Sequence, residues 1–163
     1  WIMWPVISPD GNSVAFAALG DIYMKQIGTE KTENLTEDEF VDIDPTWSPD
    51  GKQLAYLSDK EGNMDLWVLE LATGKSTKLL DHEEDLGFPV WSPDGKTIAY
   101  FVRDSRNVWG YGALHLIDVA TQDVTSLENT KFVPSKPSLS ADSKTLAVMV
   151  LQPYSSRYRE GLS

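Results

Sequence analysis

Two histidines and a recurring serine are the residues of this chain that could form a catalytic centre. His82 lies in an acidic stretch, whereas His115 lies in an apolar, strand-like one, so we do not expect them to share a metal ion. The serine recurs four times, but a nucleophile is singular and needs a base and an oxyanion site beside it. The Gly-x-Ser-x-Gly elbow of serine hydrolases is absent. We therefore interpret the serines as turn residues and His115 as a packing residue, and we expect no catalytic residue here.

Composition narrows the classes of partner and cofactor. The 163 residues include no cysteine, which excludes a disulfide framework, a thiol nucleophile and a cysteine-based zinc site. The net charge of −11 repels nucleic acid phosphate and anionic lipid, so we expect neither to be the main partner. The sequence shows no transmembrane run and no signal peptide, and we expect no membrane insertion. We also expect no cofactor.

Carboxylates gather in two stretches that we expect to be loops. Nine of the 25 acidic residues lie there: Glu37, Asp38, Glu39, Asp42 and Asp44 in the first, and Asp81, Glu83, Glu84 and Asp85 in the second. Clustered carboxylates could bind Ca²⁺ or a basic peptide. The spacing is not that of an EF-hand and charged loops are commonly solvated, so we predict no metal site. Contact with a partner is the alternative to solvated surface, with Asp42, Asp44 and Asp85 as candidate binding residues.

A third stretch, residues 103–112, combines arginine, aromatic and glycine residues. Arg, Trp and Tyr dominate the energetics of protein interfaces. We therefore predict recognition by Arg103, Arg106, Trp109 and Tyr111. The alternative is that Trp109 and Tyr111 close over their own structural unit.

These candidates are positioned by an internal repeat. Ser-Pro-Asp-Gly occurs at 8–11, 48–51 and 92–95, and a degenerate copy of the motif begins at Ser140. Successive copies therefore start 40, 44 and 48 residues apart. Each copy is followed by an apolar run, such as Leu54-Ala55-Tyr56. Repeats of this length indicate a repeat architecture. Pro-Asp-Gly suits a tight turn, because Pro presets φ and Gly accepts a positive φ.

Short β-branched and aromatic segments bounded by turn residues predict four strands per repeat. The expected first strands are 4–8, 45–48, 89–92 and 137–140; the second strands are 13–18, 53–58, 97–102 and 145–150. The third strands are 22–27, 66–71 and 114–119; the fourth are 31–35, 76–80 and 123–127. Four antiparallel strands in 40 to 48 residues predict a β-propeller blade, so the fold class is all-β.

The chain 1–163 then holds about three and a half blades: 1–38, 39–82, 83–130 and a partial blade 131–163. Propellers close with about four to eight blades. We expect a fragment of a larger ring, or half of a two-chain ring that pairs as a homodimer through its open edges. All variation in repeat length falls between the second and third strands, so one face carries the insertions. Such a face often binds the partner of a repeat protein.

The repeat Pro-x-Trp-Ser-Pro-Asp-Gly-Lys-x-Leu/Ile-Ala-Tyr, followed by the stretch Asp65–Lys75, resembles the TolB-type propeller repeat. That repeat occurs in periplasmic TolB-like proteins, in tricorn-like proteases and in the N-terminal propellers of prolyl-oligopeptidase-like peptidases. Residues 152–161 resemble a segment of the propeller that precedes the catalytic barrel of some bacterial amidohydrolases. The resemblance implies a periplasmic or secreted location, with the cytosol as the alternative.

Two functions follow as expectations. The first is a non-catalytic propeller module that binds a protein, a peptide or a substrate, with the remaining blades or a catalytic domain of the same protein as possible neighbours. The alternative is the N-terminal propeller of a metal-dependent amidohydrolase or peptidase whose catalytic domain lies outside this sequence. A lyase with its active site inside the ring would need several channel-facing histidines, which two scattered histidines do not supply.

Overall fold

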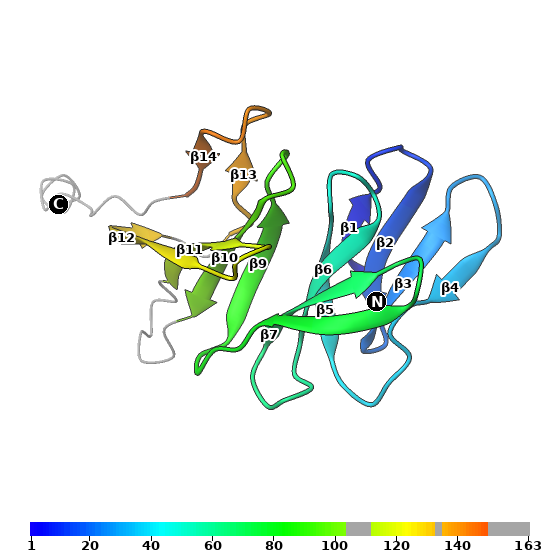
Figure 1. Ribbon diagram of the computed structural model, residues 1–163. Coiled ribbons are helices and arrows are strands. Elements are labelled where there is room, and N and C mark those ends of the chain that lie inside the picture. Colours follow the sequence, from blue (N-terminus) through cyan, green and yellow to red (C-terminus); the bar gives the residue numbers. More distant parts are fainter. Residues whose placement is uncertain (104–111, 133–134, 150–163) are drawn as a thin grey trace, which may run out of the picture.

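The computed structural model describes residues 1–103, 112–132 and 135–149, and these residues form four antiparallel sheets (Figure 1). The first sheet contains β1 (Met3–Ile7), β2 (Ser13–Ala18), β3 (Asp21–Gln26) and β4 (Thr32–Asn34). The second contains β5 (Asp42–Trp47), β6 (Gln53–Ser58), β7 (Asp65–Glu70) and β8 (Lys75–Leu80). The third contains β9 (Leu86–Trp91), β10 (Thr97–Arg103), β11 (Gly112–Asp118) and β12 (Val124–Phe132). The fourth is the pair β13 (Ser138–Leu139) and β14 (Leu146–Ala147).

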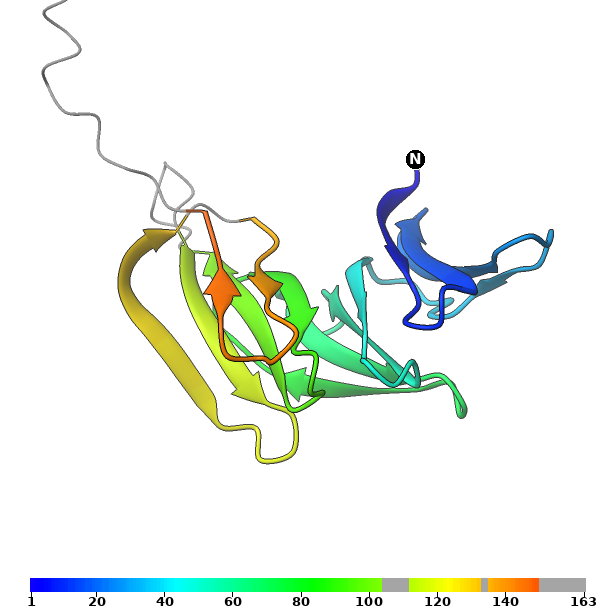
Figure 2. The same ribbon diagram turned by 90° about the horizontal axis from the view of Figure 1, so that it is seen from above.

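Each four-stranded sheet is a meander in which consecutive strands are hydrogen-bonded neighbours. This order confirms the predicted four-stranded antiparallel units. The innermost strands β1, β5 and β9 contact one another in sequence order, and the sheets follow an arc when seen from above (Figure 2). Among the described residues, no helix is long and apolar enough to cross a membrane.

The repeated serine and aspartate build the turn between the first two strands of each sheet. In the second sheet, the Ser48 hydroxyl donates to Asp50 Oδ1 over 2.7 Å and accepts from the backbone N–H of Gln53 over 2.9 Å. Gly51 has φ +70° and its N–H donates to the Ser48 carbonyl. The same contacts recur around Ser140, where Ser143 takes the left-handed position with φ +58°. The serines are thus turn residues, as predicted.

A bulge bends the innermost strand of each four-stranded sheet. Trp4, Asp44 and Phe88 each precede a proline and have φ of +49°, +52° and +54°. Each lies at a register shift against the neighbouring strand. A bulge of this kind adds an unpaired residue and turns the strand. Consequently β5 and β9 begin three residues earlier than the predicted 45–48 and 89–92.

The core lies between successive sheets. Apolar residues of the first sheet, including Ala15 and Ile22, pack against Leu54, Tyr56 and Leu69 of the second. A second cluster joins the second and third sheets in the same way. The sheets therefore stabilise one another face to face, and the alternation of apolar residues along β2, β6 and β10 specifies which faces meet.

An indole hydrogen bond also connects neighbouring sheets. Trp47 Nε1 donates to the carbonyl of Val6 over 3.1 Å, so β5 is tied to β1. Trp91 occupies the same repeat position in β9, but its buried Nε1 has no hydrogen-bond partner within the described residues. The two tryptophans fill similar positions and differ in this one bond.

We expect Trp47→Phe to lower the free energy of unfolding more than Trp91→Phe does. Both changes remove a portion of a packed ring, but only the first removes a hydrogen bond and leaves the Val6 carbonyl unpaired. The difference should be about 1 kcal/mol. Urea unfolding of the two variants, followed by circular dichroism, measures it. Equal losses would show that the indole bond does not stabilise the contact between the sheets.

Candidate functional site

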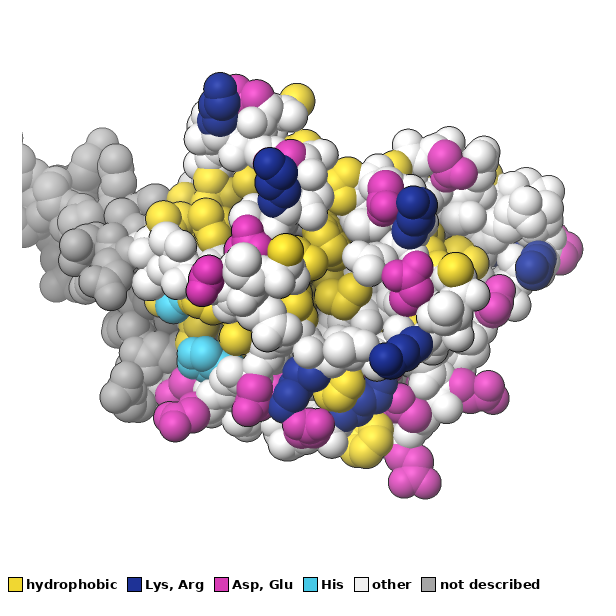
Figure 3. Space-filling view, viewed as in Figure 1, with side chains coloured by type: hydrophobic (Ala, Val, Ile, Leu, Met, Phe, Trp, Pro, Cys, Tyr) yellow, Lys and Arg dark blue, Asp and Glu magenta, His cyan; other side chains and the backbone are white. Residues whose placement is uncertain are grey.

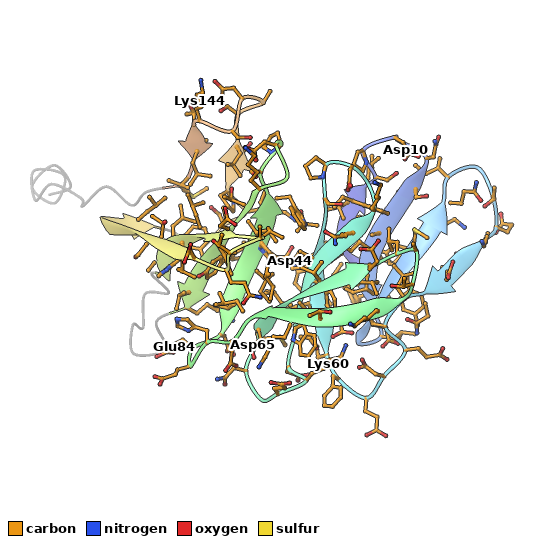
Figure 4. The ribbon with its side chains drawn as sticks, in the orientation of Figure 1. Asp10, Asp44, Lys60, Asp65, Glu84 and Lys144 are labelled. Atoms are coloured by element: carbon orange, nitrogen blue, oxygen red, sulfur yellow. The ribbon has the colours of Figure 1, made fainter. Side chains whose placement is uncertain are left out.

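The loops and the tight turns lie at opposite ends of the sheets. In Figure 4, Asp10 and Lys144 mark the end that carries the tight turns, whereas Lys60, Asp65 and Glu84 mark the other end. We call this second end the loop face. It carries the connections β2–β3, β6–β7, β4–β5 and β8–β9. Figure 3 shows acidic side chains along this lower edge, with lysines and apolar side chains between them.

The structure places some of the predicted binding residues and not others. Arg106, Trp109 and Tyr111 lie outside the described residues. Arg103 is exposed at the end of β10, and its backbone N–H donates to the Asp85 carbonyl over 2.9 Å. Asp85 is also exposed, and its Oδ1 accepts from the N–H of Met64 over 3.1 Å. Arg103 and Asp85 therefore sit beside each other at the loop end of the third sheet.

The placement of Asp42 and Asp44 in a loop was wrong. Both belong to β5, and their exposed fractions are 0% and 2%. The backbone explains the difference, because the bulge at Asp44 extends the strand back to Asp42, whose N–H donates to the Gly20 carbonyl over 2.7 Å. These two carboxylates are therefore interior groups rather than solvated ones.

Asp44 joins two sheets that are distant in sequence. Lys136, two residues before β13, places its Nζ 3.3 Å from Asp44 Oδ1. Burial raises the pKa of Asp44, while Lys136 and the backbone amide of Phe88 act in the opposite direction. Asp44, Phe88 and Lys136 occupy the same position relative to their turn serines, so the ion pair lies along the inner strands of the arc.

Asp42 faces a lysine that is shared with its neighbours. Lys60 Nζ lies 2.8 Å from Asp38 and 3.8 Å from Asp42, and it donates to the Tyr56 hydroxyl over 3.1 Å. The same ammonium stands 5.3 Å from the ring centres of Tyr56 and Trp67. Burial raises the pKa of Asp42, and the Ser58 and Thr36 hydroxyls and Lys60 oppose this effect.

A second lysine has the corresponding role near the junction of the second and third sheets. Lys78 Nζ contacts Glu61, lies 2.9 Å from Asp81 and lies 3.6 Å from Asp65. Asp65 is buried, and its Oδ1 accepts from the backbone N–H of His82 over 3.0 Å. Sequence reasoning missed Lys60 and Lys78. The available signal was their position as single cations close to acidic stretches.

Apolar side chains are exposed beside these acids. Leu19, in the β2–β3 connection, is 90% exposed, and Phe40 and Val41, in the β4–β5 connection, are each 42% exposed. The backbone brings the two connections together, because the position of a Cβ on Gly20 would lie 3.5 Å from the Phe40 carbonyl. The loop face thus combines apolar and acidic surface.

The two histidines serve separate local roles. The His82 Nδ1 accepts from the N–H of Glu84 over 3.0 Å, which closes the β8–β9 connection on itself. His115 stacks on Tyr100, with the ring centres 5.5 Å apart. The packing role that the sequence predicts for His115 agrees with this contact.

The pH dependence of stability should separate buried from turn aspartates. The neutral form of Asp44 is favoured in the fold, so its contribution to stability is complete below about pH 3.8 and is lost as the pH rises through its raised folded pKa. Asparagine mimics the neutral carboxyl group and tolerates a left-handed φ. We therefore expect Asp44→Asn to be more stable than the wild type at pH 7 and to match it below about pH 3.8.

Asp10→Asn is the control with the opposite sign. The hydrogen bond from Ser8 lowers the pKa of Asp10, so its contribution is present above about pH 3.8 and is lost as the pH falls through the lowered folded pKa. This variant should be less stable than the wild type at pH 7. The urea midpoints of both variants and the wild type, measured at pH 7 and below about pH 3.8, test these expectations. If Asp44→Asn is less stable than the wild type at pH 7, burial does not favour the neutral form of Asp44.

Known proteins with a similar sequence or structure include TolB proteins. No protein-family model matches the chain. The Tol-Pal system protein TolB of Alcanivorax borkumensis is 33% identical over 66 residues, which is 37% of this chain and 15% of that protein. The crystal structure of TolB from Acinetobacter baumannii superposes with a TM-score of 0.77 at 24% identity, over 96% of this chain and 39% of that one. The chain therefore spans less than half the length of either TolB.

A hydrolase shares the same architecture. The crystal structure of puromycin hydrolase superposes with a TM-score of 0.64 at 19% identity, over 82% of this chain and 22% of that one. The meander of each sheet, the arc of sheets and these superpositions agree with the predicted all-β propeller. The chain has the fold of a TolB-like β-propeller, of which the described residues form three four-stranded sheets and one pair of strands from a fourth.

Proposed function

We propose that this propeller is a non-catalytic binding module and that its loop face binds a basic, partly apolar segment of another protein. The observation that carries the proposal is the combination of exposed acids and exposed apolar side chains on one end of the sheets. The exposed acids of this face are Glu37, Asp38, Glu39, Glu61, Asp81, Glu83 and Asp85. Their negative potential would steer a cationic partner and raise its association rate.

The lysines of this face do not cancel that potential. Lys60 lies between Asp38 and Asp42, and Lys78 lies among Glu61, Asp65 and Asp81. Each ammonium is therefore matched by at least two carboxylates, and the surface that surrounds it stays negative. Leu19, Phe40 and Val41 supply apolar contact area next to these acids. Interfaces place such apolar groups at the centre of a polar rim.

The remaining predicted binding residues extend this surface. Arg103 and Asp85 lie at the loop end of the third sheet, and the chain from 104 to 111 continues from there. We propose that Arg106, Trp109 and Tyr111 contribute to the same surface. The similarity to a protein of the Tol-Pal system supports a role in an assembly of proteins. It also supports a periplasmic or secreted location for this chain.

The inner edge of the first sheet, at β1, offers a different kind of contact. Trp1, Ile2, Met3 and Ile7 are exposed by 104%, 67%, 43% and 65%. An apolar edge of this kind associates with another strand or sheet. We propose that a further blade of the same protein, or a second copy of this chain, covers it. The blade boundaries 1–38, 39–82, 83–130 and 131–163 belong to this proposal.

Light scattering at several concentrations distinguishes these two occupants. If copies pair, the 163-residue chain should give a stable mass of about twice 18.2 kDa. A dimer that persists on dilution supports pairing of the apolar edges, and Ile7→Glu should then convert it to a monomer. A monomer that binds a hydrophobic dye assigns the edge to a further blade.

A synthetic peptide of alternating lysine and leucine tests the loop face. We expect the wild-type chain to bind it, measured by fluorescence anisotropy of the labelled peptide, with an affinity that falls as salt is added. The double variant Glu37→Gln/Glu39→Gln should weaken binding roughly fivefold, because two exposed charges are removed from the surface. A peptide of alternating glutamate and leucine should not bind.

The matched control for this experiment is Glu30→Gln/Glu33→Gln. These two exposed acids belong to the β3–β4 hairpin, away from the loop face, and their removal changes the net charge by the same amount. The control should bind the peptide like the wild type. Equal weakening in both double variants would show that only net charge matters, and the proposed surface would then be wrong.

A second candidate function rests on the superposition with puromycin hydrolase, of which this chain matches 22%. We propose as the alternative that the propeller is the N-terminal domain of a metal-dependent amidohydrolase or peptidase. The segment 152–161, which suggested this from the sequence, lies outside the described residues. Sequencing the remainder of the coding region tests it: a downstream His-x-His motif in a barrel pattern supports it, and a stop after the last blade contradicts it.

A further inference from the structure

Buried oxygen atoms without partners gather at one place between the first two sheets. Within the described residues, six buried side-chain nitrogen or oxygen atoms lack a hydrogen-bond partner. Four of them are Asp21 Oδ1, both carboxylate oxygens of Asp42, and Ser58 Oγ. A buried polar atom without a partner costs free energy, so native structures seldom keep several together without a ligand.

These atoms belong to a cluster that has the dimensions of a cation site. Asp21, Asp38 and Asp42 each offer a carboxylate oxygen, and the three oxygens lie within 4.8 Å of one another. Asp21 begins β3, Asp42 begins β5 and Asp38 lies in the connection before it. Ser58 is the cross-strand partner of Asp42, which places its hydroxyl beside the cluster. All of these potential ligand atoms are oxygens.

The charge of the cluster is not balanced by the chain itself. Three carboxylates face one ammonium, that of Lys60, which lies 2.8 Å from Asp38 but 3.8 Å from Asp42. The Asp42 side chain has no exposed surface, so water does not offset its charge. A single lysine therefore leaves an excess of negative charge around a carboxylate that solvent does not reach.

The next repeat supplies an internal comparison. Asp65 takes the position of Asp21, but its Oδ1 accepts the N–H of His82. The other two carboxylates around Lys78, those of Glu61 and Asp81, have side chains that are 54% and 77% exposed. Leu86 begins β9 where Asp42 begins β5. At the second junction the buried carboxylate is paired with a backbone N–H and the other two face solvent. The first junction carries an additional buried carboxylate, that of Asp42.

We propose that Asp21, Asp38 and Asp42, with the Ser58 hydroxyl, bind a divalent cation of the Ca²⁺ type, which displaces the Lys60 ammonium. Ca²⁺ takes six to eight oxygen ligands in flexible geometry, whereas Mg²⁺ requires near-ideal octahedral geometry and retains its waters. A site formed by one loop and the ends of three strands suits the former. The site differs from the proposed peptide-binding surface, because it is centred on the buried Asp42 and Ser58.

Terbium luminescence tests this site in the intact 163-residue chain. Tb³⁺ occupies Ca²⁺ sites and emits when a nearby indole is excited. The Trp67 ring centre is 5.3 Å from Lys60 Nζ, so the cluster lies next to a sensitiser. We expect sensitised emission that Ca²⁺ abolishes by competition and that Mg²⁺ abolishes only at much higher concentration.

Three variants decide the assignment. Asp42→Asn and the more exposed Asp38→Asn should each weaken Tb³⁺ and Ca²⁺ binding by roughly tenfold or more, because each removes a charged ligand. Asp65→Asn, at the equivalent repeat position, should bind like the wild type. Emission that is unchanged in both Asp42→Asn and Asp38→Asn, or lost equally in Asp65→Asn, would overturn the proposal.

Lys60→Gln separates a cation site from a simple salt bridge. If the ammonium competes with the cation, this variant should bind Ca²⁺ more tightly than the wild type, and Ca²⁺ should raise its melting temperature more. If Lys60 is the permanent counter-ion, the variant should lose stability and Ca²⁺ should not restore it. The second result contradicts the proposal even if Asp42→Asn fails to fold.

Discussion

The serine–aspartate turn determines the geometry on which the rest of the arc depends. One hydroxyl donates to the aspartate two residues later and accepts from the backbone five residues later, so it defines both ends of the turn. The register between the first two strands of a sheet follows from this pair of bonds. Because the turn is short and uniform in every repeat, the length differences are confined to the opposite end. The acidic and apolar loops are thereby collected on one face.

Local pattern was sufficient for the strands that follow this turn. β2 and β6 have the predicted bounds, because turn residues and apolar alternation specify a strand through its own neighbours. The inner strands were predicted less well. Asp42 and Asp44 have the composition of a loop, and their membership of β5 depends on a bulge and on lysines 18 and 92 residues later. Contacts between residues so far apart in sequence cannot be predicted from the strand or loop propensity of neighbouring residues.

The candidate site divides in the same way. Exposed acids were identifiable from their clustering, since a run of carboxylates is visible in the sequence. The cluster around the buried Asp42 was not, because its members come from β3, β5, β6 and the connection before β5. Burial also reverses the meaning of a carboxylate: on the surface it interacts with solvent, whereas between two sheets it demands a counter-charge. Only the packing of neighbouring sheets distinguishes these cases.

The pair Asp44–Lys136 has a consequence for the time course of folding. Its two members are 92 residues apart: Asp44 lies in the second sheet and Lys136 just before the fourth. Contacts of such long range are formed after local hairpins, since the entropy of closing the intervening chain must be overcome first. The hairpins can form independently, whereas this contact requires three sheets to be stacked. Its disruption should therefore alter the rate of unfolding rather than the rate of folding, and the contact reports when the arc has assembled.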